Sequence, residues 1–369
     1  MSLVIGNILL FVCVIIELLF MRYSKKEAIP WKEVVTNINS GHILMWIFRS
    51  LAISAYQLSL HYFNLHIVDS WPRTTQWIFG FFAWDFCFYW SHRFHHLYPV
   101  LWAVHVVHHE GEHFNLSLGI RNSWYSSITS FPFFFILTIL GVPLHIFVLV
   151  SGVHYFVQFY NHNHFVKKSG WLEYILITPS HHRVHHGKND LYIDKNFGGT
   201  FVFWDKLFGS FQHERTDVPV QFGVQEPTGT MNTVLVNNIP FLKLLRGKKR
   251  SQNNLYSISN VTYFTVAGTF LLICLLLWFI YAEKTMVLIE KVMLFFIIFL
   301  GTIGNGIFCE NRLLGFVVWI VSSVVLNIVF LSWLTSTPVF LKVILFAYLF
   351  HSCFLAGLML LKLNWKHSS

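Results

Sequence analysis

The sequence predicts an all-α protein that crosses a membrane several times as a helical bundle and carries a histidine-rich cap. Three observations support this fold class. Of the 369 residues, 55% are hydrophobic and only 12% are charged, about half the charged fraction of an ordinary soluble domain. Apolar runs of about 20 residues, the length of a bilayer-spanning helix, recur along the chain. Finally, 15 of the 21 histidines fall between His92 and His186, in about a quarter of the sequence.

The first apolar run covers residues 3–21, and Arg22, Lys25 and Lys26 follow it. We interpret it as a retained membrane anchor, because it lacks the basic start and the small-residue cleavage site of a signal peptide. A second, less apolar span is predicted at 42–63. Together these elements form an N-terminal anchor region, residues 1–74.

The central region, residues 75–255, begins with a third predicted span at 75–91 that ends at the first histidine pair. Residues 124–161 are long enough for two spans, and Gly141-Val142-Pro143 in their middle predicts a turn, so they should form a helical hairpin. The most polar stretch of the chain, residues 162–255, follows. Four apolar runs at 258–281, 286–307, 313–334 and 339–361 then predict a C-terminal four-span membrane domain, residues 256–369.

The net charge of +9 is explained by basic runs beside the apolar spans, at 22–32, 167–168, 183–215 and 243–250. The positive-inside rule places these runs, and with them every histidine cluster, on the cytoplasmic side, and the loop at 64–74 outside. We therefore expect no nucleic-acid partner. Five scattered cysteines without a C-x-x-C pair argue against a disulfide framework or a thiolate zinc site.

Histidines recur in three boxes with helical spacing. Residues three and four apart on a helix share a face, so each box should direct two or three imidazoles to a common point. A further histidine opens the segment after the hairpin. The nine residues are His92 and His96 in the first box, His105, His108 and His109 in the second, His182, His185 and His186 in the third, and His162.

Imidazole is a ligand for zinc, copper, iron and nickel. A structural zinc site closes with four ligands, so nine histidines are too many for one zinc and enough for two metals of higher coordination. The spacing alone does not choose iron over zinc. Ligand histidines usually donate their second N–H to a carboxylate or carbonyl. Asp85, which lies two turns before His92 in an apolar span, and Asp194 and Asp205 are candidates for such roles.

The boxes and their surroundings resemble the fatty acid hydroxylase (sterol desaturase) superfamily of membrane di-iron oxygenases, most closely the alkylglycerol monooxygenase branch. The resemblance covers roughly residues 75–215. It rests on Trp84-Asp85, Tyr89-Trp90-Ser91-His92-Arg93, His108-His109 with Asn115-Leu116-Ser117, Thr178-Pro179-Ser180-His181-His182-Arg183-Val184-His185-His186-Gly187, Tyr192-Ile193-Asp194-Lys195-Asn196-Phe197-Gly198-Gly199-Thr200, and Trp204-Asp205-Lys206-Leu207-Phe208-Gly209-Ser210-Phe211.

The resemblance implies that the nine histidines bind two non-haem irons, and that the enzyme uses O2 to hydroxylate a C–H bond of a membrane lipid. In the closest branch the substrate is an ether lipid, oxidised at the carbon next to the ether oxygen. Asn196 joins Asp85, Asp194 and Asp205 as a candidate catalytic residue. His95 and His181 lie beside the boxes without matching ligand positions.

An electron donor is also required. Tetrahydrobiopterin supplies electrons in the alkylglycerol monooxygenase branch and is the candidate here, although Leu97 stands where the mammalian members carry an acidic residue just after the first box. Fatty acyl or aminolipid hydroxylation and sterol desaturation are the alternative reactions. A membrane haem protein or a metal-handling protein is the alternative of another class.

Overall fold

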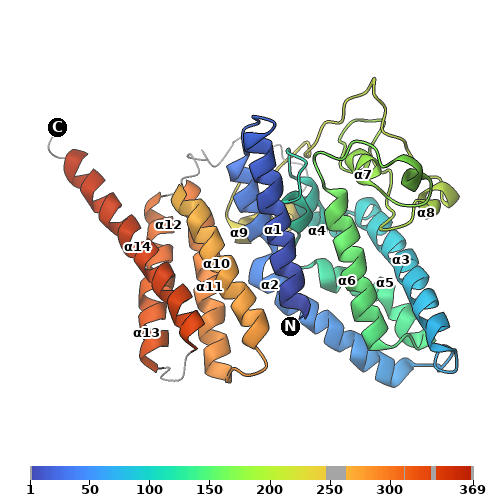
Figure 1. Ribbon diagram of the computed structural model, residues 1–369, viewed down its shortest axis with the longest axis horizontal. Helices are drawn as coiled ribbons and strands as arrows, with labels where there is room; N and C mark the ends of the chain where they lie inside the picture. Colours follow the sequence, from blue (N-terminus) through green and yellow to red (C-terminus); the bar gives the residue numbers. More distant parts are fainter. Residues whose placement is uncertain (1, 247–262, 311, 334–337, 367–369) are drawn as a thin grey trace.

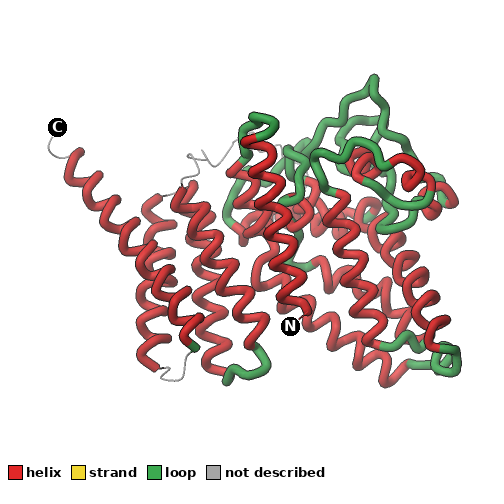
Figure 2. The backbone as a smooth tube through the Cα atoms, viewed as in Figure 1, coloured by secondary structure: helices red, strands yellow, loops and turns green. Residues whose placement is uncertain are grey.

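The computed structural model describes residues 2–246, 263–310, 312–333 and 338–366. Within these ranges the chain consists of helices and loops, with one isolated bridge between Leu176 and Phe201 (Figure 2). The predicted all-α membrane fold is confirmed. The predicted domain boundaries remain predictions, and the second of them, at residue 255, lies outside the described ranges.

Five long helices form the half of the bundle that carries the histidines (Figure 1): α1 (Ser2–Tyr23), α2 (Trp31–Phe63), α3 (Arg73–Leu97), α5 (Ser126–Leu140) and α6 (Leu144–Asn161). Pro30, Pro72 and Pro143 directly precede α2, α3 and α6, a position where the missing N–H costs nothing. Gly141 ends α5 in the left-handed conformation, φ +85°, so the predicted turn of the hairpin is present.

A loop-rich cap covers one end of this half (Figure 1). Its helices are short: α4 (Pro99–His109), η1 (Leu118–Ile120), η2 (Gly170–Tyr174), α7 (Pro179–His185), α8 (Phe203–Leu207) and α9 (Thr233–Arg246). Pro99 and Pro179 are the first residues of α4 and α7. Each proline starts a helix just before a histidine box, so the second and third boxes lie at helix C-terminal ends, as the first box does on α3.

The other half of the bundle contains α10 (Tyr263–Ala282), α11 (Leu288–Glu310), α12 (Arg312–Ile320), the π-helical turn η3 (Val321–Val325), α13 (Leu326–Trp333) and α14 (Val339–Lys366). These helices lie side by side, away from the cap (Figure 1). Their shared core is apolar, with Leu272, Ile297, Trp319 and Tyr348 buried together. The four predicted C-terminal spans are therefore helices, although the start of the first falls before residue 263.

Six stretches of the described residues are long and apolar enough to cross a membrane: 5–23, 31–63, 263–282, 288–310, 313–330 and 339–357. Three further predicted spans form helices that do not reach this standard. α5 has only 15 residues, and α3 and α6 carry polar side chains such as Asp85 and His154, which are buried inside the protein. Their polarity serves internal contacts, which is why they are less apolar than ordinary membrane spans.

Helix α2 connects the two halves. It starts eleven residues before the predicted span and bends at His42, where φ is +27°. Near the bend Asn39 Nδ2 donates to Thr269 Oγ1 of α10 at 3.3 Å, and His42 Nδ1 lies 2.9 Å from Thr302 Oγ1 of α11. Asn237 of α9 donates to the carbonyl of Ser40 at 2.9 Å. Polar contacts of α2 thus join the C-terminal helices to the cap.

Candidate metal centre

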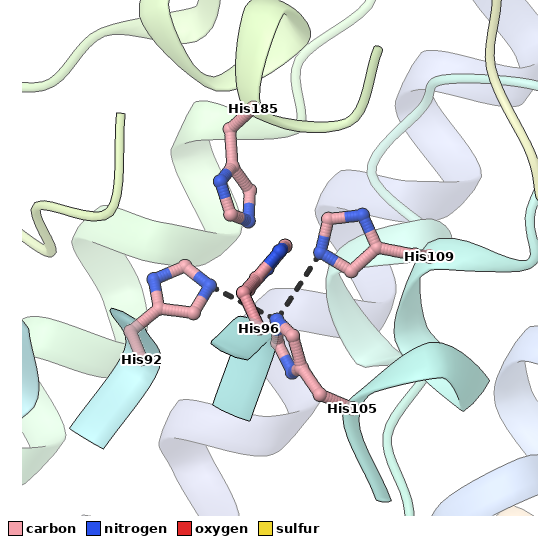
Figure 3. A group of neighbouring side chains, drawn as sticks. All are labelled: His92, His96, His105, His109 and His185. Atoms are coloured by element: carbon pink, nitrogen blue, oxygen red, sulfur yellow. Dashed lines mark hydrogen bonds between the residues drawn. The ribbon is translucent and has the colours of Figure 1, made fainter. Parts of the chain in front are cut away.

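The nine predicted histidines lie in two adjacent groups, and within each group one ring nitrogen per residue is within 4.8 Å of the others. Group one takes histidines from α3, α4 and α7, and group two from α4, α7 and the end of α6. Figure 3 shows the rings of group one directed toward a common point. Group one is His92, His96, His105, His109 and His185, and group two is His108, His162, His182 and His186.

The second and third boxes are divided between the groups. His105 and His109 belong to group one while His108 belongs to group two; His182 and His186 belong to group two while His185 belongs to group one. On an α-helix, residues i and i+4 differ by about 40° and residues i+3 and i+4 by about 100°. The i, i+4 pair therefore shares one group and the i+3 residue faces the other, whereas we had expected a whole box to face one point.

Group one offers its Nε2 atoms to the centre. His105 Nε2 lies 2.9 Å from His92 Nε2 and 3.1 Å from His109 Nε2 (Figure 3). The Nε2 atoms of His96 and His185 are buried without a hydrogen-bond partner. Buried polar atoms are normally satisfied, so two orphaned nitrogens in one cluster indicate a missing partner there.

Group two is more compact. His162 Nε2 lies 3.2 Å from His108 Nε2, 3.2 Å from His186 Nε2 and 3.1 Å from His182 Nε2, and His182 and His186 are 3.2 Å apart. Nitrogens bound tetrahedrally at 2.0–2.1 Å, the Zn–N distance, would be about 3.3 Å apart. Four imidazoles at this spacing fit one metal ion.

The electrostatics also favour a cation. Burial lowers the pKa of His105, His109 and His185 well below the ordinary value, and neighbouring imidazoles lower it further. The same holds for His182 and His186 in group two. These side chains are therefore neutral at pH 7. Neutral imidazoles whose lone pairs converge at about 3 Å repel one another unless a cation lies between them, so the residues present fit two metal ions.

One loop orients three histidines of group one. His92 Nδ1 donates to the carbonyl of Phe197 at 2.9 Å, and His185 Nδ1 donates to the carbonyl of Lys195 at 2.9 Å. His96 Nδ1 faces the Asp194 carboxylate at 3.3 Å. Since these oxygens accept hydrogen bonds, each Nδ1 carries the proton and each Nε2 keeps its lone pair for a metal.

Asp205 and Asn196 hold this loop in place. The buried Asp205 carboxylate accepts hydrogen bonds from the backbone N–H groups of Phe197 and Gly198 and from the Ser210 hydroxyl, at 2.7–2.8 Å. A side chain at Gly198 would come within 2.8 Å of that carboxylate. Asn196 adopts φ +55° and bonds the backbone of His181 and Gln212. Of the four candidate catalytic residues, Asp205 and Asn196 therefore contact the loop and not the histidine groups. Only Asp194 faces a box histidine directly.

Asp85 serves a neighbouring segment. Its carboxylate accepts hydrogen bonds from the backbone of Thr200 and Phe201 and from the indole of Trp204, and lies 3.3 Å from His154. Arg93, about two helical turns after Asp85 on α3, forms no ion pair with it and donates to the Tyr89 hydroxyl and to the carbonyl of Phe208. Asp85 thus connects α3 to the cap segment that contains Thr200, Phe201 and Trp204.

Sequence reasoning missed the support of group two. His108 Nδ1 donates to the carbonyl of Arg121 at 2.8 Å, and the Arg121 guanidinium is buried against the Glu110 carboxylate. Arg121 also donates to Asn37 of α2. Asn37 is far from Glu110 and Arg121 in the sequence, and none of the three belongs to a repeated spacing. The position of Glu110 directly after His109 was the one sequence feature that indicated this support.

His95 and His181 lie outside both groups. His95 Nδ1 donates to the carbonyl of Ser91 at 2.7 Å, and its Nε2 lies 2.9 Å from Thr129 Oγ1. Nδ1 is thus used within α3, and Nε2 joins α3 to α5. His181 lies near Thr178 Oγ1 and stacks edge-on against Phe211.

A cavity of about 530 Å³ opens onto the histidines, a size within the usual range for small-molecule sites. Its walls include histidines of both groups, the apolar Trp102, Ala103 and Val106 of α4, and part of α9. Close to it, Leu97, Tyr98 and Val100 are more than half exposed. An apolar patch of this kind beside a cavity is typical of a lipid-facing entrance.

Comparison with known proteins agrees with this geometry. Residues 77–210 match the family model "Fatty acid hydroxylase". The chain is 37% identical to alkylglycerol monooxygenase of Danio rerio over 54% of this chain and 44% of the relative, and 34% identical to that of Homo sapiens over 55% and 46%. It is 28% identical to ornithine lipid hydroxylase OlsE of Rhizobium tropici over 48% and 54%.

The chain therefore aligns with about half the length of these curated relatives. No solved structure matches it. The matched segment contains all nine histidines of the two groups together with the loop that orients group one. In this segment the chain is therefore similar to the fatty acid hydroxylase family.

Proposed function

We propose that this protein is a membrane-bound di-iron oxygenase that uses O2 to hydroxylate a C–H bond of a lipid. One observation carries the proposal: nine buried or half-buried histidines form two adjacent groups that could each hold a metal ion, at the end of a helical bundle and beside a cavity with exposed apolar residues next to it. Group one would hold one iron with five nitrogens and group two the other with four.

The bound irons would supply the O2 activation that no amino-acid side chain can perform. The protein would supply the remaining functions. Phe197, Lys195 and Asp194 fix the ring orientations of group one, and Arg121 fixes His108 of group two. The apolar α4 wall of the cavity would keep water away from the reacting carbon.

The cavity supports a lipid substrate that enters with its headgroup at the cap. Lys188, Lys243 and Glu226 line it together with the apolar residues of α4, so an amphipathic molecule would find both kinds of surface. Ether lipid hydroxylation next to the ether oxygen is our first candidate, because alkylglycerol monooxygenases are the most similar of the relatives named above. Hydroxylation of an aminolipid is the second, because of the similarity to an ornithine lipid hydroxylase.

Hydroxylation consumes two electrons in addition to O2, and tetrahydrobiopterin is the first donor to test. We also propose that the cap faces the cytoplasm, because Lys167, Lys168, Lys188 and Lys195 lie in or beside it. The basic run at 243–250 would lie on the same side; its residues after Arg246 are outside the described ranges.

The test combines lipid profiling with metal analysis. Cells with and without the protein should differ in one class of lipid, and the purified protein should contain about two irons per chain. The variants His182→Ala and His105→Ala should still insert in the membrane but lose turnover and about one iron each, while His61→Ala, an exposed histidine on α2, should match the wild type. Active protein free of iron would refute the proposal. A change confined to aminolipids would replace the ether-lipid substrate and leave the chemistry unchanged.

A further inference from the structure

A second cavity, of about 200 Å³, lies in the helical bundle between α2, α3, α5 and α6. One part of its wall is aromatic, with Trp84, Phe88, Phe134 and Phe147. The other part is polar and belongs to α2, α5, α6 and the loop before α5. The polar lining residues are Arg49, Asn122, Ser126, Ser127, Ser130, Ser151 and Gln158.

Arg49 is the charged residue of this cavity. It lies in α2, within a stretch apolar enough to cross a membrane. Its guanidinium sits within 6 Å of the rings of Trp46 and Tyr155 and makes one hydrogen bond, a long one of 3.4 Å to Ser151 Oγ. Among the described residues, every salt bridge is made by other side chains, so no carboxylate neutralises Arg49.

Most of the hydrogen-bonding capacity of Arg49 is therefore unused. A guanidinium has five N–H donors in a planar fork that matches an oxyanion. Ser127 and Ser130 likewise make no side-chain hydrogen bond to any described residue, and they line the same cavity. An unpaired arginine inside a membrane protein is costly and usually marks a binding site. These donors lack an acceptor, which the ligand would supply.

The cavity is separate from the candidate metal centre. None of its lining residues belongs to either histidine group, and Phe88, whose ring packs against His92, forms part of the wall on that side. On the outside, Leu51 of α2 and Leu149 of α6 are each about half exposed and adjoin the lining residues Ala52 and Val148. This apolar outer surface would face lipid tails.

We propose that this cavity binds the anionic group of an amphipathic lipid, with the oxyanion on Arg49 and the serine hydroxyls and the first part of the chain against the aromatic wall. Phosphate and carboxylate headgroups share this chemistry. At about 200 Å³ the cavity is smaller than the usual drug-sized site, so it would hold one part of a lipid and leave the rest in the bilayer. The proposal does not depend on the metal centre.

The test measures lipid binding to the purified full-length protein by native mass spectrometry, with three probes: phosphatidylglycerol, palmitate and phosphatidylcholine. We expect phosphatidylglycerol or palmitate to bind at least about tenfold more tightly than phosphatidylcholine, and Arg49→Gln to abolish that difference. Lys168→Gln removes a charge from an exposed lysine of the cap and should change nothing. The preferred anionic probe identifies a phospholipid or a free fatty acid as the source.

Ser130→Leu provides an independent variant, because it fills the cavity without removing the charge of Arg49. It should weaken binding of the same probe, and Arg49→Lys should retain part of it, since the charge stays while the planar fork is lost. If Arg49→Gln does not fold, these two variants decide. Equal binding of all three probes to the wild type, or unchanged binding of the anionic probe to Ser130→Leu and Arg49→Lys alike, would overturn the proposal.

Discussion

The substitution Asp205→Asn tests whether the loop over group one controls metal binding from a distance. Asp205 contacts no histidine of either group. Its Oδ1 accepts hydrogen bonds from the Phe197 N–H and the Ser210 hydroxyl, and its Oδ2 accepts one from the Gly198 N–H. The carbonyl of Phe197 in turn receives the N–H of His92.

The expected magnitude follows from these contacts. Asparagine keeps one acceptor oxygen, but its amide NH2 would face either Gly198 or Phe197, so one hydrogen bond to a charged group is lost and a buried N–H is left unsatisfied. Together these changes cost about 2–4 kcal/mol. If a third to a half of this cost, about 0.7–2 kcal/mol, reaches the metal through Phe197 and His92, the affinity of group one falls about 3- to 30-fold. This overlaps the range of about 10- to 100-fold that is typical for partners of metal ligands.

The assay is a chelator titration of the iron-loaded protein. In Asp205→Asn one of the two metals should be released at about 3- to 30-fold lower chelator concentration, while the other is released as in the wild type. Asp217→Asn, which removes a carboxylate from an exposed pair with Arg215, is the matched control. Unchanged release of both metals would show that the loop does not support group one, and equal early release of both would indicate collapse of the whole cap.

Three further predictions concern other contacts. His185→Ala and His186→Ala, although adjacent, should each lose a different metal, so each variant should retain about one metal per chain by elemental analysis; loss of both in each would contradict the division of the boxes. His95→Gln should keep both metals, because His95 bonds only protein groups, and a metal deficit there would place it among the ligands. Arg121→Gln leaves the Glu110 charge buried and unpaired, which should destabilise the protein by about 3–5 kcal/mol, measurable as a lower thermal unfolding midpoint than the wild type; an unchanged midpoint would refute this.

Much of the site follows from side-chain spacing alone. The repeated helical spacing identified eight of the nine residues of the two groups, because helical periodicity is a local property. The ninth, His162, stands alone and was identified by its place directly after the hairpin. The division of each box was also available from helix geometry, since the angle between i+3 and i+4 residues is wide. The expectation of one common point overlooked that angle.

Backbone partners could not be predicted in this way. Lys195 and Phe197 orient histidines through their carbonyl oxygens. Every residue has a backbone carbonyl, so the residue type does not indicate this role. The early start of α2 was missed for a related reason. Its first half carries Asn37, Asn39 and Ser40, which are buried in polar contacts with other segments, so it does not show the apolar pattern of a membrane helix.

The bend in α2 has a consequence for engineering this protein. Removing the C-terminal helices would take Thr269 and Thr302 away from Asn39 and His42 and leave two buried polar side chains against lipid tails, each at a cost of about 1–3 kcal/mol. Since Asn37 of the same helix bonds both Ser117 and Arg121, the disturbance would spread directly to the support of His108. A shortened protein that keeps only the histidine-bearing half would therefore need compensating apolar substitutions at positions 39 and 42 to keep the geometry of group two.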